Sequence, residues 1–552
     1  MKALGIEGTA HTFAVGIVEV EDPATGKGLR ILGRSGKMIR PEKGGIHPRE
    51  AANHHAEHAG ALVREALKEW GGDPRDLDLV AFSQGPGLGP CLRTAATAAR
   101  SVALSLGKPL VGVNHCVAHL EIGRAMTPAE DPVLLYASGG NTQVIAYVDG
   151  KYRVLGETLD IGVGNMLDKF GREMGLPFPA GPELEKLARQ ASGKLIDLPY
   201  TVKGMDVAFS GILTAALSKR DTETMADLAF SLQETVFGML VEVTERALAH
   251  TGKNEVVLGG GVACNERLRE MSRLMAEGRG GVSYAPDRSV CVDNGVMIAH
   301  TGVLMHAAGI ITPLEKTGVD QRFRTDEVQV LWRDGEQPFP RRTEPGILAR
   351  GAEAVVREAT YLGRAAVAKQ RVPKAYRHPA LDERLRSART RHEARLLSEA
   401  RRAGVRTPLV LDAHTASGTL TLERVRGVTL RERLETAGPA EAHGLLQAMG
   451  ASVARLHRAD LVHGDLTTSN VIVPEGAGED LVILDFGLAS VSIEVEDKGT
   501  DLHVLMEALE AAHGDPRERF NAFLKGYAAA GGTDEVLRRL DEIVERGRYR
   551  GT

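Results

Sequence analysis

Two histidines of this sequence, His115 and His119, stand four residues apart in the stretch Asn114-His115-Cys116-Val117-Ala118-His119. If this stretch is helical, both imidazoles lie on one face, one turn apart, and can bind the same metal ion. The residue after His115 is Cys116, whereas a zinc protease with this histidine spacing needs a glutamate there as general base. Histidines at helical spacing also occur without a metal, so a structural pair and a metal site both remain open from the spacing alone.

A second set of reactive residues lies near the end of the chain. His463-Gly464-Asp465-Leu466-Thr467-Thr468-Ser469-Asn470 is followed by Val482-Ile483-Leu484-Asp485-Phe486-Gly487. This order is typical of kinases, in which Asp465 would accept the proton of the attacking hydroxyl while Asn470 and Asp485 bind magnesium on the ATP phosphates. The spacing of these motifs predicts an ATP-using centre.

Residues upstream of these motifs complete the predicted kinase centre. Lys369 would pair with the α and β phosphates, and Glu393 would anchor that lysine. One glycine, Gly351, stands where kinases have a glycine-rich loop. We expect ATP to be covered by residues near this glycine: Leu348, Gly351, Ala352, Glu353 and Val356. No Ala-Pro-Glu follows Asp485-Phe486-Gly487, which argues against conventional phosphorylation of protein substrates.

Glycine turns after β-rich stretches are expected to position the first set of residues. The stretches Leu4 to Val18 and Val133 to Val148 share one pattern, a strand, a tight turn with a small polar residue, and a second apolar strand. Such turns bind phosphates through their backbone, so two copies would face each other across a nucleotide cleft. A third turn, Gly259-Gly260-Gly261, precedes a helical stretch that begins near Asn265.

Composition and length limit the class of protein. A chain of 552 residues predicts two or three domains. Hydrophobic residues make up 43%, and no apolar run approaches the roughly 20 residues of a membrane span, so no membrane partner is expected. The stretch Met1 to Gly8 lacks the apolar core of a secretory signal, and the four cysteines are widely spaced. We therefore expect a cytoplasmic protein without a disulfide framework.

Charge is unevenly distributed along the chain. The net charge of −5 gives no general reason to expect a nucleic-acid partner. Lysines and arginines nevertheless far outnumber acids between Arg364 and Arg406, and arginines recur from Arg538 to Arg550. A solvated helix face and a strip that binds nucleic-acid phosphates both explain this pattern.

The pattern changes near residue 335. Residues 334–346 are polar and proline-rich, which is typical of a linker. Strands and helices alternate before it, and the kinase motifs follow it. We therefore predict a domain at 1–333, a linker at 334–346 and a kinase-like domain at 347–552.

Residues 1 to about 333 resemble the actin, sugar-kinase and heat-shock ATPase fold, in which two related α/β lobes close on a nucleotide. More narrowly, they resemble the threonylcarbamoyltransferase family that makes N6-threonylcarbamoyladenosine in tRNA, called TsaD in bacteria and the catalytic subunit of the KEOPS complex in archaea and eukaryotes. Besides the histidine pair, the resemblance rests on Gly44-Gly45-Ile46-His47-Pro48, Gly85 to Leu92, Ser138 to Gln143, Asp168-Lys169, Phe209-Ser210-Gly211 and Gly259 to Asn265.

The resemblance implies a site and a substrate. A metal ion, iron by family precedent with zinc and manganese left open, would be bound by His115, His119, Tyr136 and Asp293. Threonylcarbamoyl-adenylate would be the donor and tRNA the acceptor. The residues implied to contact the adenylate are Tyr136, Ala137, Ser138, Gly139, Gly140, Asp168, Gly181, Glu185 and Asn265. None of these residues suggests itself as a general base.

Residues 347–552 resemble the small atypical kinase subunit of KEOPS, related to the p53-regulating kinase, which predicts a small bilobal α+β domain. The resemblance implies ATP hydrolysis or autophosphorylation, with a Ser/Thr kinase label, in support of tRNA modification. The whole chain then resembles an archaeal fusion of two KEOPS subunits, with other KEOPS subunits as partners. A metalloprotease, a nucleotide-switched scaffold and a small-molecule carbamoyl- or phosphotransferase are the alternatives.

Overall fold

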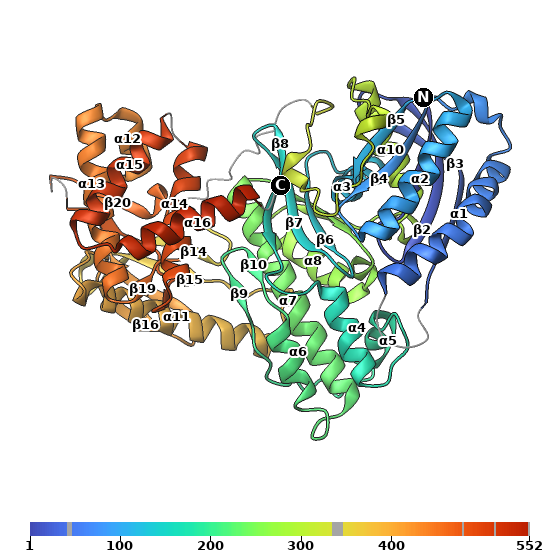
Figure 1. The fold of residues 1–552 in the computed structure, drawn as a ribbon. Coiled ribbons are helices and arrows are strands. Elements are labelled where there is room, and N and C mark those ends of the chain that lie inside the picture. Colours follow the sequence, from blue (N-terminus) through green and yellow to red (C-terminus); the bar gives the residue numbers. More distant parts are fainter. Residues whose placement is uncertain (41–46, 334–345, 477–479, 513–514, 550–552) are drawn as a thin grey trace. The chain divides into compact units, whose positions relative to one another are not determined.

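The computed structural model describes residues 1–40, 47–333, 346–476, 480–512 and 515–549 (Figure 1). The chain forms two compact units. The first contains Met1–Arg341 together with Ala375–His378, and the second contains Arg342–Lys374 and Pro379–Thr552. Most of the predicted linker, 334–345, lies outside the described residues, as does Gly44-Gly45-Ile46. Within the described ranges, no helix has the length and apolar character needed to cross a membrane.

The first sheet of the first unit has five strands in the order β3-β2-β1-β4-β5. Strands β1, β2 and β3 pair antiparallel, whereas β4 is parallel to both β1 and β5. The strands are β1 (Lys2–Glu7), β2 (Thr12–Asp22), β3 (Lys27–Met38), β4 (Leu79–Gly85) and β5 (Leu110–Asn114).

The second sheet repeats this topology in the order β8-β7-β6-β11-β12. Strands β6, β7 and β8 pair antiparallel, and β11 is parallel to both β6 and β12. The strands are β6 (Val133–Ala137), β7 (Thr142–Val148), β8 (Lys151–Glu157), β11 (Glu255–Gly259) and β12 (Val282–Tyr284). The repeated strand-turn-strand unit predicted from the sequence is confirmed, and the first unit has the two-lobed actin-like α/β fold.

Helices cover both sheets, and one helix lies between them. Apolar residues of β1 alternate between two cores, with Leu4 and Ile6 facing the core under α1 (Pro48–Trp70) and α2 (Gly89–Leu106). Helix α3 (His115–Met126) follows β5 directly and packs on β6 and β11 of the second sheet. It therefore joins the two lobes. The second sheet also packs against the helices α4 (Val163–Glu173), α5 (Gly181–Ala188), α6 (Ser210–Leu217), α7 (Met225–Thr251) and α8 (Glu266–Gly278).

Helix α10 (Gly295–Ala307) packs unusually close to β1 and β2. A Cβ atom on Gly5 would lie 2.3 Å from the Ala299 nitrogen, and one on Gly16 would lie 2.3 Å from the Val296 nitrogen. Only glycine allows this approach. The approach brings Asp293, which precedes the helix, close to the end of β1.

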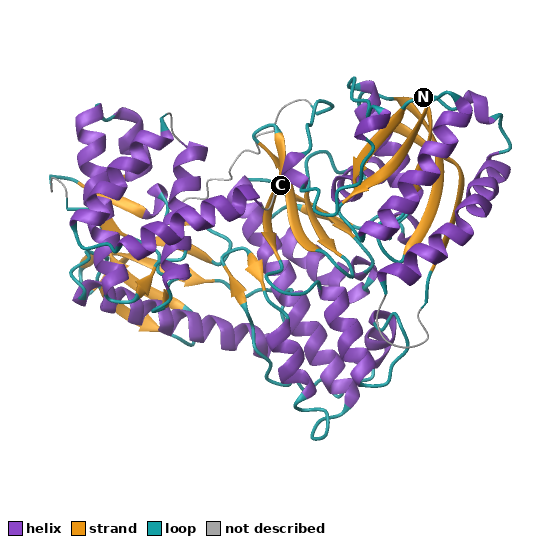
Figure 2. Cartoon of the chain, in the orientation of Figure 1, coloured by secondary structure: helices purple, strands orange, loops and turns teal. Residues whose placement is uncertain are grey.

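The second unit is a small bilobal α+β domain, as predicted. Its antiparallel sheet has the order β13-β14-β15-β17-β16 and packs against α11 (Pro379–Arg402). These strands are β13 (Ile347–Arg350), β14 (Ala354–Tyr361), β15 (Arg364–Arg371), β16 (Val410–His414) and β17 (Thr419–Glu423). Figure 2 shows the helices that make up most of the rest: α12 (Leu430–Thr436), α13 (Pro439–Arg458), α14 (Val495–Ala512), α15 (Pro516–Ala529) and α16 (Asp534–Tyr549).

Candidate metal and nucleotide sites

Helix α3 begins at His115, so both histidines lie in its first two turns. The Asn114 side chain caps the helix, because its Oδ1 accepts hydrogen bonds from the backbone of Cys116 at 3.0 Å and Val117 at 3.2 Å. The cap fixes where the helix starts. It therefore also fixes the direction in which His115 and His119 leave the backbone.

Four side chains predicted to bind a metal converge at this helix start. The Nε2 atom of His115 is 2.8 Å from the Tyr136 hydroxyl and 3.5 Å from Asp293 Oδ1, and His119 Nε2 is 3.3 Å from the same carboxylate oxygen. Ligand atoms of His115, His119 and Asp293 all lie within 4.8 Å of one another. Two imidazoles, a phenol and a carboxylate from three elements thus point at one place. This donor set fits a metal ion.

Glu7, at the end of β1, belongs to the candidate site but was not singled out from the sequence. Its fully buried carboxylate lies 3.0 Å from Nδ1 of His115, and its other oxygen accepts hydrogen bonds from the Thr9 backbone and hydroxyl at 2.7 and 2.6 Å. A carboxylate on the outer nitrogen orients a ligand histidine and raises its basicity. The available signal was an acid that ends the otherwise apolar stretch Lys2–Glu7 just before a glycine turn.

Charges around the site shift several pKa values. Burial alone would lower the pKa of His115, but the Glu7 carboxylate raises it to about 9. Burial would raise the pKa of Asp293, yet the hydrogen bond from His119 and the charge of His115 hold it below its usual range. Burial raises the pKa of Tyr136 well above 10, with a further contribution from Asp293. A metal ion would have to displace the protons of His115 and Tyr136 to gain both as ligands.

The glycine turns of the second lobe pack against each other beside the predicted metal ligands. Tyr136 and Ala137 end β6, and the turn Ser138–Gly140 follows them. Gly260 has φ +91°, and a Cβ on it would lie 2.4 Å from the Ala137 carbonyl oxygen, so this backbone contact requires glycine. Apart from the adjacent residues and the backbone of the same helix, no described atom lies within 4 Å of the Cβ position at Gly140, Gly181 or Gly261. The backbone is therefore open to a ligand at these glycines.

The other residues implied to contact an adenylate form hydrogen bonds at the ends of helices. Asp168 on α4 accepts a hydrogen bond from the Ala180 backbone at 2.7 Å, directly before Gly181, and burial raises its pKa. Glu185 accepts one from the Glu266 backbone at 3.1 Å. Asn265 caps α8 and accepts one from Arg267 at 2.9 Å. The structure thus gives each of these side chains a bond within the protein, and their contacts to an adenylate stay a prediction.

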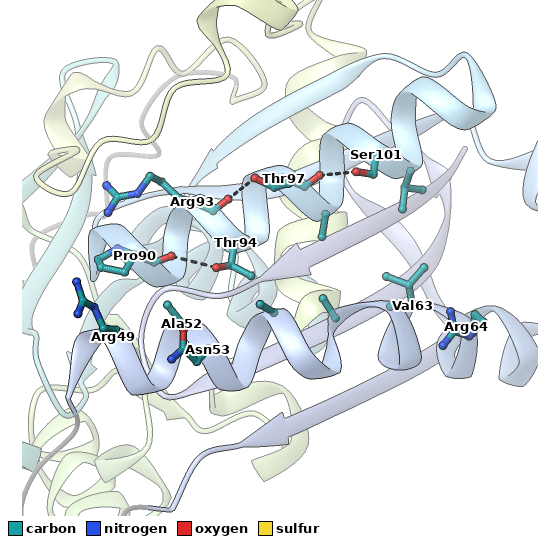
Figure 3. A pocket seen from close by; sticks show the side chains of 15 residues that line it. Arg49, Ala52, Asn53, Val63, Arg64, Pro90, Arg93, Thr94, Thr97 and Ser101 are labelled. Carbon is teal, nitrogen blue, oxygen red and sulfur yellow. Dashed lines mark hydrogen bonds between the residues drawn. The ribbon is translucent and has the colours of Figure 1, made fainter.

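The described part of the first lobe contains a smaller and a larger cavity. The smaller, of about 260 Å³, is lined by Asp293 and by residues of β2, β3 and the start of α10. The larger, of about 880 Å³, lies between α1 and α2 and contains none of the predicted site residues. Figure 3 shows that the hydroxyls of Thr94, Thr97 and Ser101 in it donate to carbonyls of their own helix. Of the four predicted metal ligands, Asp293 is the one that lines the smaller cavity.

In the second unit, the structure brings together the residues of the predicted kinase centre. Lys369 on β15 lies 2.7 Å from Glu393 of α11 and 2.6 Å from Asp485. Asn470 donates to the Asp465 carboxylate at 2.9 Å. Asp485 has φ +53°, a strained conformation that is typical of functional sites. Burial alone would raise the pKa of Asp485, but Lys369 lowers it to about 2, so this carboxylate is charged and suited to hold a cation.

The residues expected to cover ATP lie on one hairpin. Strand β13 contains Leu348, β14 contains Val356, and Gly351, Ala352 and Glu353 form the turn between them. Val356 pairs with Lys369 across β14 and β15. The hairpin is therefore anchored beside the lysine. Glu353 also pairs with Arg389 of α11 at 3.1 Å.

Asp501 on α14 is a second residue that the motifs did not single out. Its buried carboxylate accepts hydrogen bonds from the backbone of His463 at 2.9 Å and of Gly464 at 2.8 Å. It therefore fixes the loop that carries Asp465. Helix α14 begins at Val495, close after Gly487, so no long activation segment separates them.

Much of the basic stretch from Arg364 to Arg406 is engaged inside the protein. The cations of the stretch that pair with described acids include Lys369, Arg371, Arg377, Arg386, Arg389, Arg395 and Arg406. The solvent-exposed cations are Arg364, Arg391, Arg395, Arg401 and Arg402, of which Arg395 also pairs with Glu399. A phosphate-binding strip would have to be built on this smaller set.

Known proteins resemble both units. Residues 30–300 match the family described as tRNA N6-adenosine threonylcarbamoyltransferase, TsaD, and residues 349–527 match the lipopolysaccharide kinase (Kdo/WaaP) family. Three relatives bear the name "probable bifunctional tRNA threonylcarbamoyladenosine biosynthesis protein". The Methanosarcina mazei protein is 49% identical over 99% of both chains, the Methanothermobacter thermautotrophicus protein 50% over 100% of both, and the Thermoplasma acidophilum protein 44% over 100% of both.

These relatives match over nearly their whole length, so the similarity includes both units and the order in which they occur. The two sheets with one topology, the four converging donors and the Lys369–Glu393–Asp485 cluster agree with a transferase unit followed by a kinase-like unit. The chain belongs to the family of bifunctional tRNA threonylcarbamoyladenosine biosynthesis proteins.

Proposed function

We propose that the first unit transfers the threonylcarbamoyl group from threonylcarbamoyl-adenylate to N6 of the adenosine 3′ of the anticodon, in tRNAs that read codons beginning with A. The observation that carries this proposal is the convergence of His115, His119, Tyr136 and Asp293 beside open glycine turns. An activated carbonyl donor needs both features, one to stabilise negative charge on the reacting carbonyl and one to hold its phosphate.

We propose iron as the metal of this site. Imidazole, phenolate and carboxylate donors suit iron, although zinc and manganese accept the same donors. When bound, the ion would polarise the carbamoyl carbonyl and stabilise negative charge on its oxygen. Glu7 would hold His115 so that Nε2 faces the other three ligands.

The remaining steps follow from the residues of the chain. Backbone amides of Ser138–Gly140 and the start of α5 at Gly181 would hold the adenylate. The adenosine N6 forms a bond to the carbamoyl carbon, the bond from this carbon to the phosphate oxygen breaks, AMP leaves with the electron pair, and the amine passes a proton to water. AMP is a good leaving group, so its departure needs little help from a general acid.

For the second unit we propose ATP hydrolysis and autophosphorylation that support the modification. Asp465 would accept the proton of the attacking water or hydroxyl, Asn470 and Asp485 would bind magnesium, and Lys369 would contact the phosphates. The Kdo/WaaP match agrees with a phosphotransferase whose acceptor is not a docked peptide. We further propose that the protein works in the cytoplasm with other KEOPS subunits.

Mass spectrometry of tRNA nucleosides tests the transfer. The full chain, loaded with iron, is incubated with tRNA and threonylcarbamoyl-adenylate, with and without other KEOPS subunits. We expect threonylcarbamoyladenosine with the unaltered chain and with Asp485→Asn, and its loss with His119→Ala. An adenylate that stays intact under every condition would contradict the proposal, and cleavage of a protein substrate would favour the protease alternative.

A further inference from the structure

Arg371 lies in the kinase centre, where no motif assigns it a role. It follows Lys369 by two residues on β15, so both side chains leave the same face of the sheet. The Glu393 carboxylate binds both cations, with Oε1 2.7 Å from Lys369 Nζ and Oε2 2.7 Å from Arg371 Nη2. The glutamate that anchors the lysine is therefore shared with an arginine.

The hydrogen bonds of Arg371 are incomplete. Its side chain is 3% exposed, and neither Nε nor Nη1 has a hydrogen-bond partner among the described residues. Buried donors without acceptors cost free energy, so a purely structural arginine would be expected to have partners at these atoms. The Nε atom lies 3.9 Å from Glu353 Oε2, which is beyond hydrogen-bond distance.

Glu353 links this arginine to the hairpin expected to cover ATP. It belongs to the turn between β13 and β14, and its Oε1 is held by Arg389 of α11 at 3.1 Å. A short movement of the turn toward the sheet would bring Oε2 within hydrogen-bond distance of Arg371. Closing of the turn would then give a partner to a buried donor of Arg371 that has none among the described residues.

Lys369 also has to change partners when a nucleotide binds. It lies between Glu393 and Asp485. A Cβ on Gly487 would lie 3.0 Å from Asp485 Oδ1, 3.5 Å from Arg371 Nη2 and 3.8 Å from Lys369 Nζ, so all three charges surround this glycine. If Lys369 turns to the phosphates, Asp485 is released to bind magnesium. Glu393 then depends on Arg371 to keep its position.

We propose that Arg371 is a positioning residue of the kinase centre. It holds Glu393 while Lys369 turns from Asp485 to the phosphates, and it receives Glu353 when the covering turn closes on ATP. This inference rests on the proposed use of ATP by the second unit. Its consequence is that Arg371 affects ATP affinity more than the chemical step.

Steady-state ATP hydrolysis by the full chain tests the inference. We expect Arg371→Gln to raise KM for ATP at least tenfold while kcat changes less than threefold. Glu353→Gln, at a partly exposed side chain, is expected to raise KM at least threefold. The double variant should be no worse than Arg371→Gln, because both changes break the same link. Arg371→Lys keeps the positive charge but loses the forked guanidinium group. Its KM for ATP should therefore lie between those of the unaltered chain and Arg371→Gln. Arg395→Gln, at an exposed site of α11, is the matched control with unchanged KM.

Unchanged KM in both Arg371→Gln and Glu353→Gln would overturn the inference and leave a structural role. If Arg371→Gln does not fold, the test rests on Glu353→Gln and Arg371→Lys. An unchanged KM for ATP in both of these variants would also overturn the inference. An unaltered chain that neither hydrolyses nor binds ATP would instead overturn the proposed function of the unit, and the inference with it.

Discussion

Glu7 binds Nδ1 of His115, and this contact determines which nitrogen of the ring faces Tyr136 and Asp293. The pair also shows how burial and charge compete. Burial disfavours a charged imidazole, yet the buried carboxylate at 3.0 Å outweighs it and raises the pKa of His115 to about 9. The result is a histidine held in one orientation with its inner nitrogen directed at the other ligands.

Glu7→Gln is expected to weaken metal binding by roughly 10- to 100-fold, the usual effect of losing a partner of a ligand histidine. The amide keeps the shape of the side chain but loses the charge. Metal content after dialysis against graded chelator measures the effect. Glu21→Gln, an exposed acid on β2, should bind as the unaltered chain does. Equal metal retention by Glu7→Gln and Glu21→Gln would contradict the role given to Glu7.

At the scale of elements, the close packing of α10 on β1 and β2 determines where Asp293, just before this helix, lies in the site. A methyl group on Gly16 cannot fit 2.3 Å from the Val296 nitrogen, so Gly16→Ala must displace the helix or the strand. We expect this variant to retain several-fold less metal, although residue 16 contacts no metal ligand directly. Gly60→Ala on α1 is the control, because its nearest neighbour would be 3.6 Å away. Full metal retention by Gly16→Ala would show that the helix does not position Asp293.

Asp206, in the hairpin of β9 (Val202–Lys203) and β10 (Asp206–Val207), predicts a pH dependence of stability. Burial raises its pKa to about 6 despite a hydrogen bond from the Glu157 backbone. The pKa of Asp206 is higher in the folded state than in the unfolded state. The contribution of its protonated carboxyl to the free energy of unfolding is therefore complete below about pH 4 and is lost as pH rises through 6.

Asp206→Asn cannot ionise and should therefore gain stability relative to the unaltered chain as pH rises, by about 2–3 kcal/mol between pH 4.5 and 7.5. Urea unfolding followed by tryptophan fluorescence measures it, because both tryptophans of the chain, Trp70 and Trp332, belong to the first unit. If Asp206→Asn and the unaltered chain differ in free energy of unfolding by the same amount at both pH values, the raised pKa of Asp206 would be contradicted.

Sequence patterns predicted the elements better than the contacts between them. The helix that carries His115 and His119 and the repeated hairpins follow from local spacing. The Lys369–Glu393 pair follows from the order of the kinase motifs, and the structure contains it too. Glu7, Arg371 and Asp501 act through partners 108, 22 and 38 residues away. Neither local spacing nor the motifs relate these residues to partners so far away in the sequence. Most of the basic stretch was expected to face solvent or phosphate, and its buried pairs could be found only in the folded chain.

At the scale of the whole molecule, the division into units does not follow the order of the sequence. Ala375–His378 come after the linker, yet they belong to the first unit. There Arg377 pairs with Glu242 at 2.5 Å, and both side chains are buried. Fusion also fixes the ratio of the two activities at one to one and keeps the units at high effective concentration.

Arg377→Met is therefore expected to destabilise the first unit, by about 3–5 kcal/mol, because it leaves a buried carboxylate without this partner. Tryptophan fluorescence during thermal unfolding reports on that unit alone. Arg395→Met, an exposed change in the same stretch of sequence, should leave the transition in place. A transition that is equally unaffected by Arg377→Met would contradict the assignment of this segment.

The central claim is that a metal held by His115, His119, Tyr136 and Asp293 supports threonylcarbamoyl transfer. Its most direct test is the rate of threonylcarbamoyladenosine formation in tRNA as a function of metal occupancy, with iron removed from the full chain in steps by chelator. We predict a rate proportional to occupancy, restored by adding iron back, and at least 100-fold lower in Asp293→Asn at every iron concentration. An undiminished rate in the metal-free chain, or in Asp293→Asn, would contradict the account.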